Sequence, residues 1–321
     1  MTRHGSIRRA FLSLAALVGL AGSAVPLPAH AAAAGAVPCP DLITAVKPLK
    51  TGFKWTEGPA WDPRGQRWIF SDLMAETEYA ITPAGQLTPL RRQAGYPNGH
   101  ALLADGSFIV AQHDRTLGRV NADGTGYQVL ASTFQGKKLN SPNDVVVAAN
   151  GDVYFSDPIF GIDGYGPAKA KPELPFRGVF RWRNGNLTLI SDQIQVPNGV
   201  GLSPNGSTLY VSETTTNTIY TINLNDFQGR PLPAKPLFKF EQIAAGHPAA
   251  QASDGLRVDG KGRIWATGPG GIGVYTVEGK RVCEIPFHDH VANLAPGGKD
   301  NRQILVTSAD KVYLINLRQA F

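Results

Sequence analysis

The chain has 321 residues, of which 42% are hydrophobic and only 17% are charged, with 36 glycines and 24 prolines. This composition argues against a helical or disordered chain and favours many short strands joined by tight turns. The formal net charge of +6 falls to +3 without the first 31 residues, which carry three arginines and no acidic residue. No Lys/Arg run with interleaved aromatic residues occurs, so nucleic acid is not an expected partner.

Residues 1–31 have the pattern of a signal peptide. Arg8 and Arg9 precede an apolar run at 10–20, and residues 29–31 read Ala-His-Ala, a small-x-small cleavage pattern. The paired arginines resemble a twin-arginine signal, which exports folded proteins. A membrane anchor is the alternative, but the apolar run is too short to span a bilayer comfortably. We therefore expect a periplasmic or secreted protein that has no membrane association after signal removal.

One hairpin pattern recurs along the rest of the chain. Its clearest copy runs from Leu139 to Pro158, where an Asn150-Gly151 turn joins two apolar runs. Asn-Gly between two β-rich runs is a strong signal for a hairpin. Six copies occur, with weaker hairpins between them, and their turns lie at Gly65, Gly106, Gly151, Gly206, Gly262 and Asn301.

Repeated four-stranded units are typical of a β-propeller. We predict an all-β fold, a six-bladed β-propeller of four-stranded blades around a central channel, over residues 52–321. Residues 32–51 are expected to be a separate N-terminal segment, and Val312 to Leu317 a last lone strand. A β-sandwich is the alternative, but it does not explain the regular repetition of the hairpin.

A side chain with an oxygen atom stands eight residues before each of the six turns. In a propeller this position opens the innermost strand at one mouth of the channel, so the six side chains should converge on the axis. Asn and Asp also favour turns through bonds to their own backbone, which is a purely structural alternative. Two carboxylates among amide oxygens, however, suit a hard divalent cation. The positions are Glu57, Asn98, Asn143, Asn198, Asp254 and Asn293.

Four stretches, at 56–65, 140–161, 197–214 and 253–271, carry a family likeness. Together they resemble the gluconolactonase branch of the SMP-30/gluconolactonase/luciferin-regenerating-enzyme family, and the resemblance extends from Gly52 to Leu317. It implies a six-bladed propeller with a catalytic divalent cation held over the channel. Calcium is the first expectation for that ion, with Zn²⁺, Mg²⁺, Mn²⁺ and Fe²⁺ as alternatives.

The resemblance also implies roles for particular residues. Its metal ligands match Glu57, Asn143, Asn198 and Asp254. Asn98 and Asn293 match no obvious ligand of the family, so we expect them at the rim of the site or behind the ligands. Ser141 stands where animal members have a substrate-binding arginine, which puts their sugar specificity in doubt for this chain.

The resemblance implies hydrolysis of a sugar lactone, such as the aldono-1,5-lactone gluconolactone, to the aldonic acid. A divalent cation polarises the lactone carbonyl and stabilises the oxyanion that forms. Asp254 and Asn143 are the candidate catalytic residues, and Asp254 acts either as the base for water or as a ligand only. Organophosphate esters or other lactones are alternative substrates of the same site. A binding propeller without catalysis, with a structural cation, is the third reading.

Further residues are candidates for contact with substrate. His113 and Arg115 follow the second strand of the second blade, and we assign them to substrate binding together with Asn98 and Ser141. Asp144 is expected to orient the Asn143 amide. The loop after Pro158 is long for a tight repeat, and its Phe160 and Tyr165 are expected to form a lid.

Two local patterns stay open or weak. Cys39 and Cys283 are the two cysteines, and they form either a disulfide, which export would permit, or two buried thiols. His288-Asp289-His290 suggests zinc, but alternating histidines without a third ligand more often belong to an ordinary strand or loop. The sequence says nothing about oligomeric state.

Overall fold

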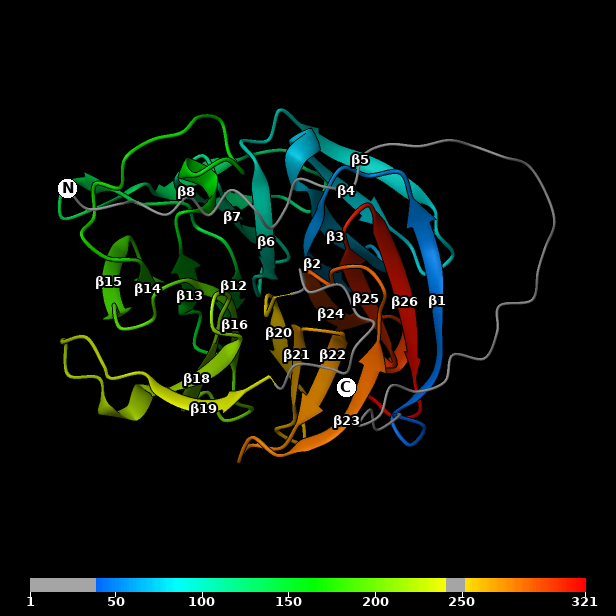
Figure 1. Ribbon diagram of the computed structural model, residues 1–321. Helices are drawn as coiled ribbons and strands as arrows, with labels where there is room; N and C mark the ends of the chain where they lie inside the picture. The colour runs from blue at the N-terminus through cyan, green and yellow to red at the C-terminus, as the bar shows by residue number, and fades with distance from the viewer. Residues whose placement is uncertain (1–38, 241–251) are drawn as a thin grey trace, which may run out of the picture.

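A computed structural model describes residues 39–240 and 252–321. Its regular structure is almost all β, with six four-stranded sheets that follow one another around a common axis (Figure 1). The predicted six-bladed β-propeller is therefore confirmed. The signal peptide predicted at 1–31 lies outside the described residues. Within them, no helix is long and apolar enough to cross a membrane.

Each of the first three blades is an antiparallel sheet in sequence order. Blade one contains β2 (Thr56–Asp62), β3 (Arg67–Asp72), β4 (Thr77–Ile81) and β5 (Leu87–Arg92). Blade two contains β6 (Pro97–Leu102), β7 (Phe108–Gln112), β8 (Thr116–Val120) and β9 (Gln128–Ala131). Blade three contains β12 (Val145–Val147), β13 (Val153–Asp157), β14 (Gly178–Arg183) and β15 (Asn186–Ser191).

Blades four and five repeat the pattern. Blade four contains β16 (Pro197–Leu202), β17 (Thr208–Glu213), β18 (Thr218–Asn223) and β19 (Lys235–Lys239). Blade five contains β20 (Leu256–Val258), β21 (Ile264–Gly268), β22 (Gly271–Tyr275) and β23 (Arg281–Pro286). The remaining short elements are a ribbon of β10 (Thr133–Phe134) and β11 (Lys137–Lys138) and the 3₁₀ turns η1 (Leu73–Ala75), η2 (Phe160–Ile162), η3 (Leu224–Asp226) and η4 (Lys299–Asn301).

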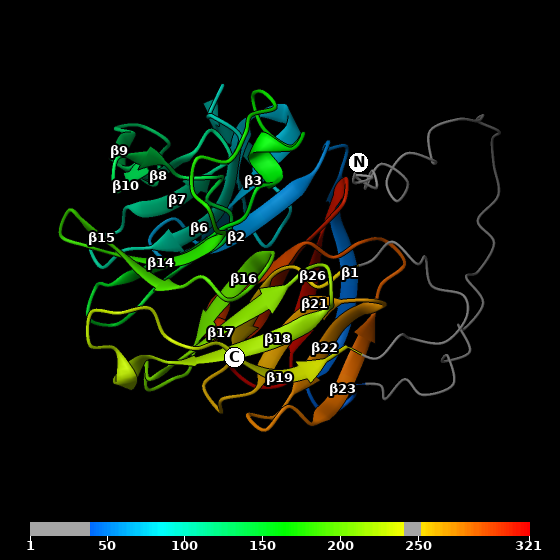
Figure 2. The same cartoon turned by 60° about the vertical axis from the view of Figure 1, so that its left-hand side comes forward.

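Both ends of the chain contribute to the sixth blade. Its inner strands are β24 (Asn293–Gly297), β25 (Gln303–Ser308) and β26 (Lys311–Leu317), and its outer strand is β1 (Ile43–Thr51). β1 runs antiparallel to β26, with Ile43 opposite Leu317 and Thr51 opposite Lys311. Figure 2 shows the two strands side by side. The propeller thus includes residues before 52, and the last strand is not a lone one.

The sequence does not reveal this closure because β1 is an edge strand. Most of its residues are exposed, so it lacks the continuous apolar run that marks buried inner strands such as β7 and β13. Its partner also lies at the opposite end of the chain, where no turn connects the two.

A disulfide joins Cys39 to Cys283 across 244 positions of the sequence, with the two Cα atoms 5.2 Å apart. Cys39 precedes β1, whereas Cys283 lies on β23 of blade five. Of the two alternatives that the sequence left open, the disulfide is therefore the one formed. It connects the segment before β1 to blade five.

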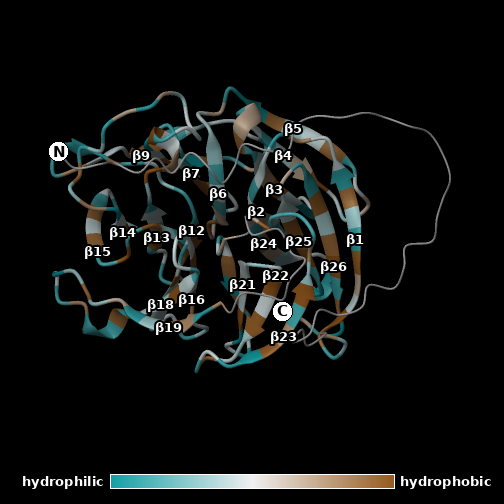
Figure 3. Ribbon diagram, viewed as in Figure 1, coloured by the Kyte–Doolittle hydropathy of each residue, from teal (hydrophilic) through white to brown (hydrophobic). Residues whose placement is uncertain are grey.

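The hydrophobic core lies between the blades. Ile109 of blade two packs in one cluster with Phe155 of blade three, and Trp68 of blade one packs with Leu305 of blade six. Hydrophobic residues accordingly follow the strands in the interior of the molecule (Figure 3). Because inner strands such as β7 and β13 are buried on both faces, the polar groups at this end of the blades are held on a rigid frame.

Candidate active site

The residues that open the inner strands meet at one mouth of the channel. Five of the six positions with oxygen side chains, at Glu57, Asn98, Asn143, Asn198 and Asp254, line one cavity of about 120 Å³. Asn293 is buried but does not line it; its Oδ1 accepts a hydrogen bond from the backbone N–H of Leu294 at 2.9 Å.

Local breaks in the strand ladders help to aim these side chains. Pairing is interrupted between Glu57 and Ala60, between Pro97 and His100, and between Pro197 and Val200. Such irregularities bend a strand and redirect the side chains beside them. They occur at the three strands that carry Glu57, Asn98 and Asn198.

The two carboxylates of the cavity are buried close to each other. Burial raises the pKa of Glu57 well above its usual range, and the charges of Asp254 and Asp144 raise it further. Burial and the charge of Asp144 likewise raise the pKa of Asp254. Two such groups repel each other when both are ionised, and a cation between them would relieve this repulsion.

His113 orients two of the amides. Its Nδ1 lies 2.8 Å from the carbonyl oxygen of Tyr165, so Nδ1 carries the hydrogen and donates it. Nε2 therefore accepts from the side-chain Nδ2 atoms of Asn98, at 3.0 Å, and Asn143, at 3.3 Å. Burial lowers the pKa of His113 to about 4, so the ring stays neutral near pH 7.

The amide oxygens are left without partners in the protein. Asn198 donates its Nδ2 hydrogen to Thr214 Oγ1 at 3.1 Å, and its Oδ1 is buried without a hydrogen bond. The Oδ1 of Asn98 is also buried without a hydrogen-bond partner. A buried oxygen without a partner is costly, and both residues line the same cavity as the carboxylates.

This set of donors fits a hard divalent cation. Two carboxylates with amide oxygens are the ligands that Ca²⁺ prefers, whereas zinc sites are built from Cys and His with few carboxylates. Within the described residues, no three His, Cys, Asp or Glu side chains cluster in an arrangement typical of a metal site. The fit thus depends on the amide oxygens as well as on the two carboxylates.

His290 lines this cavity, although no role was predicted for it. Its Nε2 is 2.9 Å from Asp254 Oδ2, and its ring stacks on Trp55 with centroids 5.5 Å apart. Its Nδ1 is buried without a hydrogen-bond partner. A usable signal was its position three residues before Asn293, because loops that lead into inner strands reach the same mouth. His288 of the same motif is 87% exposed and does not line the cavity.

Two residues assigned to substrate binding do not line the cavity. The Ser141 hydroxyl is fully buried; it donates to Pro158 O at 2.6 Å and accepts from the Gly161 N–H. Arg115 donates to Leu139 O and pairs with Glu173 at 3.2 Å. Both side chains are occupied in holding the loop after β13 and its neighbours, so the structure offers no substrate contact for either.

The other candidates have mixed placements. Phe160 and Tyr165 do line the cavity, from the loop between β13 and β14. His113 lines it as well. Asp144 makes no hydrogen bond to the Asn143 amide; its carboxylate instead pairs with Arg257. The expectation that Asp144 orients that amide is therefore wrong, and His113 does so instead.

Comparison with known proteins agrees with this geometry. Residues 55–310 match the model of the SMP-30/Gluconolactonase/LRE-like region. A gluconolactonase of Zymomonas mobilis is 30% identical over 257 residues, which cover 75% of this chain and 72% of that protein. The pentonolactonase XacC of Haloferax volcanii is 25% identical over 274 residues, covering 83% and 86% of the two chains.

A solved structure extends the match. The structure of a gluconolactonase from Xanthomonas campestris has a TM-score of 0.77 and 27% sequence identity, and covers 89% of this chain and 98% of its own. The similar fold of that structure, the family match at 55–310 and the arrangement of the inner-strand residues of this chain all indicate the same family. The chain belongs to the SMP-30/gluconolactonase/LRE-like family.

Proposed function

We propose that this protein hydrolyses a sugar lactone with the help of a divalent cation, most favourably Ca²⁺. The observation that carries the proposal is the convergence of two buried carboxylates and several amide oxygens at one mouth of the channel. The relatives that are named as gluconolactonases and as a pentonolactonase support this reaction class.

Glu57, Asn143, Asn198 and Asp254 would hold the ion, with the Asn98 oxygen beside them. When bound, a cation supplies Lewis-acid polarisation of the lactone carbonyl. His113 fixes the amides of Asn98 and Asn143 by accepting their N–H groups, so their oxygens are turned away from its ring. The site is thus organised before substrate arrives, which avoids reorganisation during the reaction.

Asp254 and His290 are placed to orient the attacking water. Because Nε2 of a neutral His290 donates to Asp254, its Nδ1 is an acceptor without a protein partner. A water donating to Nδ1 would lie across the imidazole ring from Asp254, whose carboxylate holds the ring so that Nδ1 can present this water to the lactone carbonyl. The oxygen of this water bonds to the carbonyl carbon as one of its protons passes to Nδ1 of His290; the ring C–O bond then breaks, and the ring oxygen takes up that proton to give the hydroxy acid.

The cavity wall indicates the kind of lactone. Trp55, Leu73, Phe160 and Tyr165 form an apolar side against which the C–H face of a sugar ring can pack. Within the described residues no Lys or Arg lines the cavity. We therefore propose an uncharged aldonolactone rather than a phosphorylated one, since an anionic group would find no cationic side chain there.

We also propose that the protein is exported. The signal-like segment at 1–31 supports this location. The disulfide between Cys39 and Cys283 supports it independently, because such bonds persist in oxidising compartments.

The test is lactone hydrolysis before and after chelation. Purified protein is assayed with glucono-1,5-lactone, a pentonolactone, 6-phosphogluconolactone and a phosphotriester. We expect hydrolysis of the two uncharged sugar lactones, loss of activity after EDTA and dialysis, and recovery with Ca²⁺. Full activity after thorough chelation contradicts the role of the cation, and preference for the phosphotriester contradicts the substrate class.

A further inference from the structure

Glycines let the inner strands approach one another just below the oxygen donors. The residue after the donor is glycine at Gly58, Gly99, Gly199 and Gly255. A Cβ atom on Gly199 would lie 2.3 Å from Asp254 O, and one on Gly99 would lie 2.7 Å from Asn143 O. Side chains are therefore excluded there, because the backbones of neighbouring blades are in direct contact.

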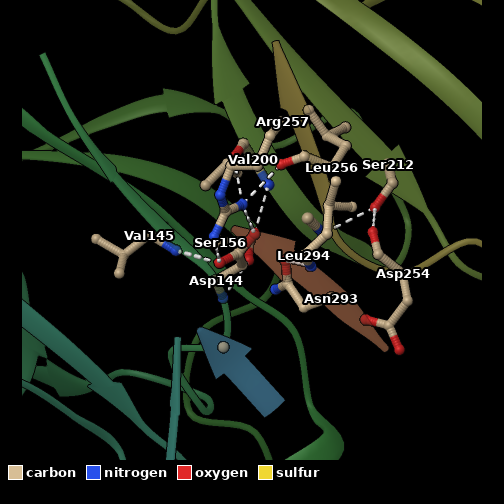
Figure 4. A network of polar contacts seen from close by, with 12 residues as sticks. Asp144, Val145, Ser156, Val200, Ser212, Asp254, Leu256, Arg257, Asn293 and Leu294 are labelled. Atoms are coloured by element: carbon tan, nitrogen blue, oxygen red, sulfur yellow. Dashed lines mark hydrogen bonds and ion pairs between the residues drawn. The ribbon is translucent and has the colours of Figure 1, made fainter. Parts of the chain in front are cut away.

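Blade three departs from this pattern. Asp144 follows Asn143, and its carboxylate is fully buried. It accepts hydrogen bonds from the N–H of Val145 at 2.9 Å and from the N–H of Val200 at 3.1 Å. Arg257 Nη1 lies 2.9 Å from Asp144 Oδ2, and Nη2 lies 3.3 Å from Oδ1 (Figure 4). One carboxylate thus contacts blades three, four and five.

The Arg257 guanidinium extends these contacts. Its Nη1 also donates to Leu256 O at 2.6 Å and approaches Val200 O at 3.4 Å. Its side chain is only 13% exposed, so the ion pair is screened little by water. The two-pronged geometry fixes direction as well as distance, which a lysine ammonium does not do.

Every anchor of this ion pair is close in sequence to an oxygen donor of the site. Asp144 directly follows Asn143, Val200 lies two residues after Asn198, and Arg257 lies three residues after Asp254. The Gly199 N–H donates to Asp254 O at 3.1 Å, which couples blades four and five one residue before Val200. A change in the ion pair would therefore shift three of the donors relative to one another.

We propose that Asp144 and Arg257 are positioning residues that set the spacing of Asn143, Asn198 and Asp254 for cation binding. This inference rests on the proposed function, since it assumes that these oxygens bind a cation. The role is not one of charge. If Arg257 acted only through its positive charge, its removal would strengthen the binding of a nearby cation or leave it unchanged. A positioning role predicts the opposite sign.

The experiment measures Tb³⁺ binding by luminescence, with Trp55 of the cavity as the sensitiser, and Ca²⁺ affinity by competition. Arg257→Gln is compared with Arg263→Gln. Arg263 pairs with the buried Asp259 at 2.7 Å in the same blade, so it is a matched ion pair away from the donors. We expect Arg257→Gln to weaken the affinity for both ions by tenfold or more. Arg263→Gln should change the ion affinity by less than twofold. Both variants should unfold at lower urea concentrations than the wild type.

The outcomes separate the inference from the function on which it rests. Unchanged or tighter ion binding in Arg257→Gln, with a normal signal in the wild type, overturns the positioning role and leaves the proposed function intact. No Tb³⁺ or Ca²⁺ binding to the wild type overturns both. If Arg257→Gln does not fold, Arg257→Lys carries the same test. It keeps the charge but loses the two-pronged contact, so its affinity should still fall, and an unchanged affinity contradicts the inference.

Discussion

Two histidines, His113 and His290, have different roles around the same oxygen donors. His113 is neutral and fully hydrogen-bonded, with Nδ1 on Tyr165 O and Nε2 on two amides. His290 contacts Asp254 through Nε2 and keeps its other nitrogen, Nδ1, without a hydrogen-bond partner. The first therefore serves to fix the site, whereas the second is available to bind water or substrate.

The His290 assignment leads to a test at one residue. His290→Gln should lower kcat by about 100-fold, as expected for loss of a group that acts on the attacking water. His288→Gln, two residues away and exposed, should keep the wild-type kcat. Steady-state kinetics with glucono-1,5-lactone check both variants. Equal rates for His290→Gln and the wild type would remove His290 from the mechanism.

Only part of the site could be predicted at the level of residues. Glu57, Asn143, Asn198 and Asp254 were found because they recur in phase with the hairpin turns. Arg115 and Ser141 were misplaced, since their contacts depend on the course of the loop after β13, which no periodic pattern specifies. His290 was missed for the same reason, because a loop histidine carries no repeat signal.

At the scale of elements, a buried polar cluster joins blades one and two. Glu78 of β4 accepts from Arg91 of β5 at 2.8 Å and contacts His100 of β6 at 3.1 Å. Burial opposes ionisation of Glu78, but the hydrogen bonds from Arg91 and His100 prevail and lower its pKa to about 2. The carboxylate therefore stays charged in the folded protein below the pH at which it would protonate in the unfolded chain.

The resulting pH dependence has a definite sign. Because the folded pKa lies below the unfolded value of 4.5, this stabilisation is complete above pH 4.5 and is lost as the pH falls towards 2. It amounts to about 3 kcal/mol of unfolding free energy. Urea unfolding from pH 6 to pH 3 should show a steeper loss of stability for the wild type than for Glu78→Gln. Parallel curves would contradict the shifted pKa.

The elements themselves were largely predictable, apart from one. Asn-Gly and similar turns set the inner hairpins, and β12 and β13 pair across Asn150-Gly151 as the sequence indicates. β1 was not predictable, since it is an exposed edge strand whose partner β26 is at the other end of the chain.

At the scale of the whole molecule, the ring is closed by β1 and fastened by the disulfide between Cys39 and Cys283. A cross-link over 244 positions restricts the unfolded chain strongly, and such bonds typically contribute about 2–5 kcal/mol. Cys39→Ser should therefore melt several degrees below the wild type. Adding reductant should lower the melting temperature of the wild type but not that of the variant. Identical melting of all samples would show that the cross-link does not stabilise the closure.

The proposed lactone hydrolysis requires that the inner-strand oxygens of this propeller bind a cation. A crystal structure of the protein grown with Ca²⁺, with anomalous data to identify the ion, tests it most directly. We expect one ion at the mouth of the channel, with oxygens of Glu57, Asn143, Asn198 and Asp254 at about 2.3–2.6 Å. An ion bound elsewhere, or these four side chains pointing apart in the presence of saturating Ca²⁺, would rule out cation binding by this set of oxygens.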